Sequence, residues 1–270
     1  MPVDVLAEVL ANTRLSSDCQ ILALAAPEIA AQTRPGQFVM VKAASGTDPL
    51  LRRPFSVFEI LRDRTGTVIG LSLLSRRVGV TTGQLFDMEP GARVACLGPL
   101  GRAFTLADPP AEAWMVAGGV GLAPFATLAE TLAARGVPLT LFLGGRCAAD
   151  LFCLDLFERL GARLSLATED GSVGHHGIVT EPLTRALAAR PASQPVSIYA
   201  CGPEPMLAAV GRIAAEHGRP AELAMERIMG CGVGGCYSCV VRVRDAIGRT
   251  RFVRSCLEGP VFKGEDIVWD

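Results

Sequence analysis

The stretch Gly230-Cys231-Gly232-Val233-Gly234-Gly235-Cys236 decides how the last part of this chain folds. Together with two later cysteines it forms the pattern Cys231-x4-Cys236-x2-Cys239-x16-Cys256, which is the ligand spacing of a plant-type 2Fe–2S cluster. Four thiolates must converge on two irons, and so tight a loop needs residues without a Cβ, which reach positive φ and direct N–H groups at the sulfurs. The pattern predicts an iron–sulfur cluster.

Zinc and disulfides are the alternatives for these cysteines. Structural zinc sites usually take two Cys-x2-Cys pairs, whereas this segment has one, Cys236 and Cys239. The other five cysteines are scattered through apolar segments, where a thiol acts as a small buried hydrophobe: Cys19, Cys96, Cys147, Cys153 and Cys201.

Length, charge and hydropathy narrow the class of protein. At 270 residues the chain exceeds a usual domain of roughly 100 to 200 residues, so two or three units are expected. A net charge of −1 argues against nucleic-acid binding. Glycines and a proline interrupt the longest apolar stretch, residues 113–129, which argues against a membrane span. No secretory signal is visible in residues 1–14, so a reducing cytoplasm is the expected location.

The hydrophobic pattern changes twice along the chain. Residues 1–106 carry short alternating and β-branched runs after turn dipeptides, which predicts a small antiparallel β-barrel. Residues 107–222 alternate apolar runs with alanine-rich segments of helical length, which predicts a parallel α/β domain. Residues 223–270 form a small cysteine-rich module, in which residues 240–244 and 251–253 are expected to pair as a hairpin.

Two motifs in the first domain suit a nucleotide cofactor. In Arg53-Pro54-Phe55-Ser56 the arginine can grip a diphosphate and the serine can face a planar ring. In isolation this motif also fits a surface arginine beside a β-turn. In Val78-Gly79-Val80-Thr81-Thr82-Gly83, the candidates Gly79, Thr81 and Thr82 open a helix, where amides and hydroxyls can form a phosphate site.

Two strand ends in the second domain suit a dinucleotide. Gly118-Gly119-Val120-Gly121 precedes Pro124, which predicts a strand, a tight turn and a helix with proline in its first turn, directed at a pyrophosphate. Proline replaces the last glycine of the Rossmann fingerprint, and a turn that serves packing alone is the alternative. Cys201 and Gly202 follow another strand and should border a nicotinamide pocket, unless Cys201 is one more buried thiol. None of the three histidines has a convincing acid/base partner, which fits an electron carrier better than a hydrolase.

In this order, the motifs Arg53-Pro54-Phe55-Ser56, Gly118-Gly119-Val120-Gly121 and Cys201-Gly202-Pro203 resemble the ferredoxin–NADP reductase superfamily, which pairs a flavin barrel with a nicotinamide domain. The cysteine module begins at Met225-Glu226-Arg227-Ile228-Met229-Gly230-Cys231, and Glu169-Asp170-Gly171-Ser172-Val173-Gly174 is also present. With these, essentially the whole chain resembles the electron-transfer subunits of dihydroorotate dehydrogenase B.

The resemblance implies that the chain carries FAD and a 2Fe–2S cluster and uses NAD as electron acceptor or donor. The cluster would be held by Cys231, Cys236, Cys239 and Cys256. Two departures weaken individual flavin contacts, because position 75 is serine where an aromatic residue is expected and Val80 stands where lysine is common. The FAD contacts carried over are Arg53, Pro54, Phe55, Ser56, Leu74, Ser75, Arg76, Thr81 and Thr82.

The resemblance also implies a partner. Nicotinamide exchanges two electrons as hydride and the cluster exchanges one, and a flavin can do both. No group in this chain is left to oxidise dihydroorotate. We therefore expect an FMN-containing dihydroorotate dehydrogenase catalytic subunit, in a heterotetramer of two plus two, with electrons passing from dihydroorotate through FMN, cluster and FAD to NAD in de novo pyrimidine (UMP) biosynthesis.

Two other functions share part of this evidence. One is a flavin and iron–sulfur subunit of another NAD(P)H-dependent oxidoreductase, of the ferredoxin reductase, sulfide dehydrogenase or hydrogenase type. The other is a zinc-binding interaction module in which the glycine loops only pack. In Gly144-Gly145-Arg146-Cys147-Ala148-Ala149-Asp150, one arginine and a nearby acid favour NAD over NADP.

Overall fold

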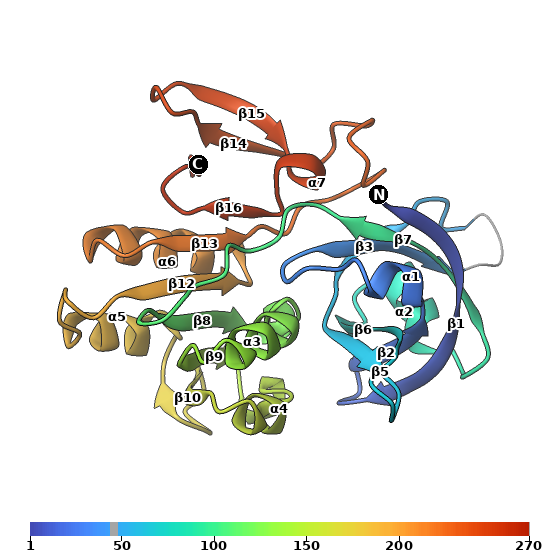
Figure 1. Cartoon of the computed structure of the whole chain (residues 1–270), viewed down its shortest axis with the longest axis horizontal. Coiled ribbons are helices and arrows are strands. Elements are labelled where there is room, and N and C mark those ends of the chain that lie inside the picture. Colours follow the sequence, from blue (N-terminus) through green and yellow to red (C-terminus); the bar gives the residue numbers. More distant parts are fainter. Residues whose placement is uncertain (44–47, 270) are drawn as a thin grey trace.

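The computed structural model describes residues 1–43 and 48–269, which form three parts in contact with one another (Figure 1). An antiparallel sheet lies at the right of the view, a larger sheet with helices lies at the lower left, and a small hairpin module lies above them. Among the described residues, no helix is long and apolar enough to cross a membrane.

The first sheet has seven antiparallel strands in the order β4-β3-β7-β1-β2-β6-β5. Every second residue of β7 is buried from Val94 onward, because successive side chains of a strand point to opposite faces. Residues of both short helices complete its core. The predicted barrel is thus an antiparallel half-barrel with β4 and β5 at its edges. Its elements are β1 (Val3–Arg14), β2 (Cys19–Ala25), α1 (Pro27–Ala30), β3 (Phe38–Ala43), β4 (Arg53–Ser56), β5 (Glu59–Arg62), β6 (Val68–Arg76), α2 (Val80–Phe86) and β7 (Arg93–Leu100).

The second sheet has the order β11-β10-β9-β8-β12-β13-β16, in which β16 alone runs antiparallel. The chain leaves β8 towards β11 on one side and then returns to β12 on the other, so the direction of winding switches between β8 and β12. Ligands of such sheets bind outside the carboxyl ends of the strands at this switch point. The elements are β8 (Glu112–Gly118), η1 (Gly119–Leu122), α3 (Phe125–Ala134), β9 (Leu139–Gly145), η2 (Ala148–Asp150), α4 (Leu154–Arg159), β10 (Arg163–Thr168), β11 (His175–His176), α5 (Thr180–Ala188), β12 (Val196–Cys201), α6 (Glu204–Glu216), β13 (Ala221–Ala224) and β16 (Val261–Lys263).

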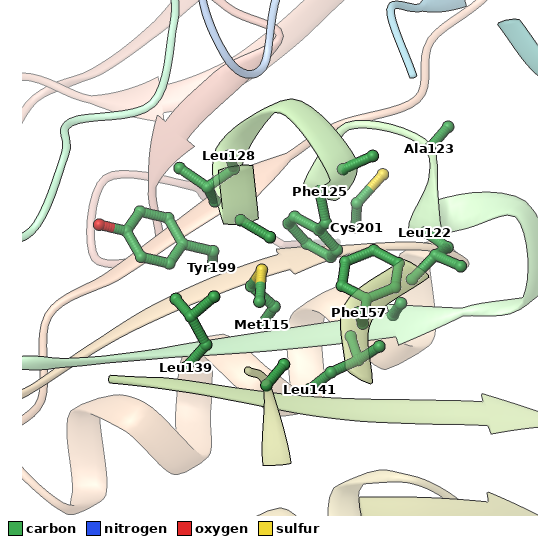
Figure 2. Packing of buried hydrophobic residues seen from close by; sticks show 14 of the residues in the cluster. Met115, Leu122, Ala123, Phe125, Leu128, Leu139, Leu141, Phe157, Tyr199 and Cys201 are labelled. Atoms are coloured by element: carbon green, nitrogen blue, oxygen red, sulfur yellow. The ribbon is translucent and has the colours of Figure 1, made fainter. Parts of the chain in front are cut away.

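Helices cover both faces of this sheet. On one face Phe125 of α3 and Phe157 of α4 pack against Met115 and Leu141 of the strands (Figure 2). Side chains of α5 and α6 cover the other face. Strands buried on both sides read as continuous apolar runs, which is why the sequence predicted a parallel α/β unit here.

A tyrosine fixes the segment that links the two sheets. Tyr199 of β12 is 2% exposed, and its hydroxyl donates to the carbonyl oxygen of Thr105 at 2.7 Å and accepts from the amide of Ala107 at 3.0 Å. Phe104 meets the Tyr199 ring edge-on, with centroids 5.3 Å apart. The linker is therefore bonded and packed against the second sheet immediately after β7.

The cysteine module contains the predicted hairpin, in which Val241 of β14 (Val240–Arg244) pairs with Val253 of β15 (Thr250–Arg254). Helix α7 (Ser255–Glu258) follows, and the amide of Ser255 donates to the carbonyl oxygen of Cys239 at 2.9 Å. The chain then returns to the second sheet, because β16 pairs with β13. The edge strand of the second sheet thus comes from residues that follow the cysteine motif.

Tyr199→Phe is expected to lower the free energy of unfolding by about 1 to 3 kcal/mol, because the Ala107 amide loses its acceptor in a buried place. Urea denaturation measures the difference. Tyr237→Phe is the matched control, since Tyr237 is 62% exposed. Equal stability of the Tyr199→Phe variant and the parent chain would contradict the role given to this hydroxyl.

Candidate functional site

Two large cavities meet where the half-barrel faces the second sheet. One has a volume of about 890 Å³ and is lined mainly by the half-barrel and by residues 225–229. The other has a volume of about 750 Å³ and lies at the carboxyl ends of β8, β9 and β12. Arg76, Val120 and Glu226 line both cavities. Ligands in the two cavities would therefore lie next to each other.

The first cavity, called here the flavin cavity, collects the residues that the resemblance assigns to FAD. The four residues of β4 form one wall. The end of β6 forms a second wall, and the start of α2 forms a third. The predicted residues in its lining are Arg53, Pro54, Phe55, Ser56, Leu74, Ser75, Arg76, Gly79, Thr81, Thr82 and Cys201.

The two threonines of α2 differ in what they can offer a ligand. The hydroxyl of Thr82 accepts from the amides of Val78 and Gly79, both at 2.9 Å, and so completes the start of the helix. Thr81 is 4% exposed, and its hydroxyl has no hydrogen-bond partner among the described residues. A buried unpaired hydroxyl in a cavity wall fits a bound polar group such as a phosphate.

Arg52, which precedes β4, and Arg53, the first residue of β4, also differ in their partners. Arg52 forms an ion pair with Asp4 at 2.8 Å, which occupies its guanidinium. Arg53 is exposed, and among the described residues its guanidinium donates to the nearby carbonyl oxygens of Leu51 and Arg52. Arg53 therefore stays the predicted arginine contact of a diphosphate.

The second cavity, called here the nucleotide cavity, is lined by the glycines at the end of β8 and by the turn after β12. The predicted residues Gly118, Gly119, Gly121 and Gly202 are all in its lining, whereas Cys201 faces the flavin cavity. A Cβ on Gly121 would lie 2.3 Å from the carbonyl oxygen of Cys201, so only glycine lets the two strand ends approach so closely. Pro124 precedes α3 as its N-cap and does not lie in its first turn, and η1 forms the turn itself.

An ion-pair network joins the walls of the two cavities. Asp150 accepts from Arg146 at 2.8 Å and from Arg76 at 2.6 Å, and Arg76 also lies 2.9 Å from Asp18. Hydrogen bonds from Arg146 and then from Arg76 lower the pKa of Asp150 to about 2, against the opposing effect of its burial. Asp150 is thus a carboxylate at neutral pH and bonds both walls together.

Sequence reasoning missed Glu226, which lies where the two cavities meet. Burial by the surrounding protein raises the pKa of Glu226. Burial also raises the pKa of the Cys201 thiol, and the charge of Glu226 adds to this effect. Glu226 follows the buried pair Ala224 and Met225 directly after β13. A charged residue just beyond the carboxyl end of a parallel strand is the signal that could have identified it.

The thiols of the spacing motif interact in two pairs, Cys231 with Cys236 and Cys239 with Cys256. Amides of Val233 and Gly235 point at the Cys231 sulfur, at 3.4 and 3.2 Å. In the described part of the chain, no three His, Cys, Asp or Glu residues are grouped to hold a single metal ion. Two interacting thiol pairs, with N–H donors directed at Cys231, fit a two-iron cluster in which each iron takes two cysteines.

The environments of these thiols differ. Hydrogen bonding with Ser238 lowers the pKa of Cys236 to about 6, which favours the thiolate that a metal requires. Burial raises the pKa of Cys256 to about 12. Cys239 and Cys256 are buried on the side of the half-barrel, whereas Cys236 is exposed. One side of the cluster loop therefore faces the flavin cavity and the other faces solvent.

Comparison with protein-family models gives two matches. Residues 226–268 match the iron–sulfur cluster binding domain of dihydroorotate dehydrogenase B. Residues 115–212 match the oxidoreductase NAD-binding domain. The first range contains all four cysteines and the second contains the glycine loop of β8.

Curated relatives match over nearly the whole chain. The electron transfer subunit of dihydroorotate dehydrogenase B (NAD(+)) from Desulforamulus reducens is 39% identical over 264 residues, covering 98% of both chains. The subunit of the same name from Enterococcus faecalis strain V583 is 34% identical over 262 residues, covering 96% of both.

Solved structures share the fold. An NADH-dependent reduced ferredoxin–NADP oxidoreductase, studied for flavin-based electron bifurcation, aligns with a TM-score of 0.83 and 28% identity, covering 98% of this chain and 90% of that one. A ferredoxin–NADP reductase from Neisseria gonorrhoeae aligns with a TM-score of 0.64 and 18% identity over 80% of this chain and 92% of its own, which shows the fold alone.

These findings confirm the predicted oxidoreductase class and the predicted cofactors, FAD, a 2Fe–2S cluster and NAD. They also confirm the family to which the sequence resemblance pointed. The chain belongs to the family of electron-transfer subunits of dihydroorotate dehydrogenase B.

Proposed function

We propose that this chain carries electrons between an FMN-containing dihydroorotate dehydrogenase catalytic subunit and NAD, in pyrimidine biosynthesis in the cytoplasm. Dihydroorotate would lose two electrons and two protons on the partner. The electrons would pass singly through the cluster to FAD, and NAD⁺ would receive them from the flavin as hydride. Orotate, NADH and one proton would result. The observation that carries the proposal is the shared wall of the two cavities, beside the cluster loop.

The chain's residues support this path in order. The glycine turn of β8 and Gly202 would hold the dinucleotide, and the lining of the flavin cavity would hold FAD. Met229, which precedes the first cysteine, lines the flavin cavity and packs against Cys239 and Cys256. We assign FAD to residues 1–106, NAD to residues 107–222 and the cluster to residues 223–270.

A partner surface is supported by the side chains around the cluster loop. Exposed apolar groups gathered at one place usually mark a protein contact. Around the exposed Cys236 the chain presents Val233 and Tyr237 of the loop and Leu257, which lies against Gly234; these three are 54%, 62% and 44% exposed. We propose that the catalytic subunit binds here, in an assembly of two chains of each kind.

A second candidate is the flavin subunit of another NAD(P)H-dependent oxidoreductase. The likeness to the NADH-dependent ferredoxin–NADP oxidoreductase, at a TM-score of 0.83, favours it. The partner distinguishes the two functions, because one partner must oxidise dihydroorotate and the other must accept a different donor.

The purified chain is expected to reduce ferricyanide with NADH and to leave dihydroorotate unchanged, because FAD and the nicotinamide dinucleotide would occupy the two cavities and would leave no site there for dihydroorotate. Absorbance assays for NADH oxidation and for orotate measure both. Orotate formation should appear only after an FMN-containing catalytic subunit is added. Orotate formation by the chain in isolation would contradict the proposal that the partner subunit oxidises dihydroorotate.

Cys236→Ser is expected to remove the cluster and to leave FAD bound, because Cys236 lies outside the flavin cavity. Visible absorbance, iron content and acid-labile sulfide measure the cluster, and flavin fluorescence after denaturation measures FAD. Cys147→Ser is the matched control, since Cys147 is a half-buried thiol outside the loop. Retention of the cluster spectrum in the Cys236→Ser variant would mean that the ligand set is misassigned.

NADH is expected to be preferred over NADPH by about tenfold or more in kcat/KM, which is about 1.4 kcal/mol. Asp150 holds Arg146, and Glu169 adds a carboxylate to the nucleotide cavity, so a 2′-phosphate is repelled there. Glu169→Gln should lower the ratio of kcat/KM for NADH to that for NADPH. Glu158→Gln, on the exposed side of α4, should leave this ratio unchanged. A preference for NADPH in the parent chain would overturn this assignment.

A further inference from the structure

The cluster loop rests on the half-barrel through a small mixed core. Phe38 and Met40 of β3 and Leu100 of β7 pack with Met229, Cys239 and Cys256 in one buried cluster. Two of the four cysteine ligands of the motif are therefore part of the contact between the module and the half-barrel.

Gly232 brings the backbone of the cluster loop close to the half-barrel in this contact. A Cβ at this position would lie 2.4 Å from Met40 Cγ, 2.9 Å from Met40 Sδ and 3.3 Å from Leu100 Cδ1. Met40 is fully buried, so it cannot move aside into solvent. The φ angle of Gly232 is +73°, which other residues rarely adopt. The backbone of the loop thus lies directly on the side chain of Met40.

A second contact holds the other end of the module. The amide of Arg102 donates to the carbonyl oxygen of Gly259 at 2.6 Å, and the amide of Met225 donates to that of Pro260 at 2.9 Å. With this end bonded by backbone hydrogen bonds, lifting the loop at Gly232 would tilt the module away from the half-barrel.

The same layer of side chains separates the flavin cavity from the cysteines. Phe38 and Met229 line the cavity on one side and pack against Cys239 and Cys256 on the other. Electron tunnelling rates fall steeply with the distance between donor and acceptor. The thickness of this layer therefore controls how fast electrons pass between the two cofactors.

We propose that Gly232 is a positioning residue that sets the distance between the flavin and the cluster, by letting the cluster loop rest directly on Met40. The proposal rests on the proposed function, since it needs electrons to pass between these two groups. A side chain at position 232 separates the loop from β3 and slows this transfer without changing the ligands of the cluster.

The test uses the full chain loaded with FAD and cluster, mixed anaerobically with NADH in a stopped-flow spectrometer. NADH supplies two electrons as hydride, of which the cluster accepts one. In Gly232→Ala the flavin should be reduced at the parent rate, because Gly232 lines neither cavity. Reduction of the cluster should be several-fold slower, while iron content and the spectrum of the oxidised cluster are unchanged.

Gly234→Ala is the matched control. Gly234 has a similar φ of +84° in the same loop, but a Cβ there would meet Leu257 of the module itself, at 2.5 Å, and not the half-barrel. Its transfer rate should stay near that of the parent. Gly232→Ala combined with Met40→Ala removes the atoms that the new Cβ meets and should recover part of the lost rate.

Hydrogen exchange gives a readout independent of electron transfer. Peptides covering Phe38–Ala43 of β3 should exchange faster in Gly232→Ala than in the parent or in Gly234→Ala. The proposal would be overturned if Gly232→Ala kept the parent rates of electron transfer and hydrogen exchange. It would also be overturned if electron transfer slowed equally in Gly232→Ala and Gly234→Ala, or if Gly232→Ala lost the cluster. If the parent chain itself passes no electron from flavin to cluster, the proposed function fails instead.

Discussion

The contact between the two seven-stranded sheets is the constraint on which the rest of the structure depends. Tyr199 and Phe104 hold the linker between the sheets, and the Arg76–Asp150 ion pair joins them again at the cavity walls. Both cavities owe their shared wall to this fixed orientation. A chain whose sheets moved independently would still bind each nucleotide, but it would not keep the two reactive rings adjacent.

The glycines of the chain serve a related purpose at two points. At Gly121 the missing side chain lets the ends of β8 and β12 meet at the switch point of the sheet. At Gly232 it lets the cluster loop touch β3. In both places the backbone lies close to a neighbouring element and brings one cofactor site nearer to the next. Because glycine has no side chain, these two residues set the spacing of the sites.

Much of this arrangement could be predicted from local sequence, because cofactor loops impose strong local demands. A few neighbouring residues were enough to predict the chemistry of three segments: the cysteine motif, the glycine turn after β8 and the threonines of α2. Glu226 and Asp150 could not be assigned, since their roles arise from the meeting of segments far apart in the chain. The return of β16 to the second sheet was also missed, because strand pairing across the whole module leaves no local pattern.

The return of β16 has a consequence for biogenesis. Residues 225–260 leave the second sheet after β13 and come back to it at β16, so the iron-binding segment is an excursion from that sheet with both ends anchored. Until this excursion has closed, the outer side of β13 presents unpaired backbone groups, which invite association with other chains. The nucleotide-binding half of the protein is therefore complete only after the segment that follows the cluster motif has been synthesised and β16 has covered this sheet edge.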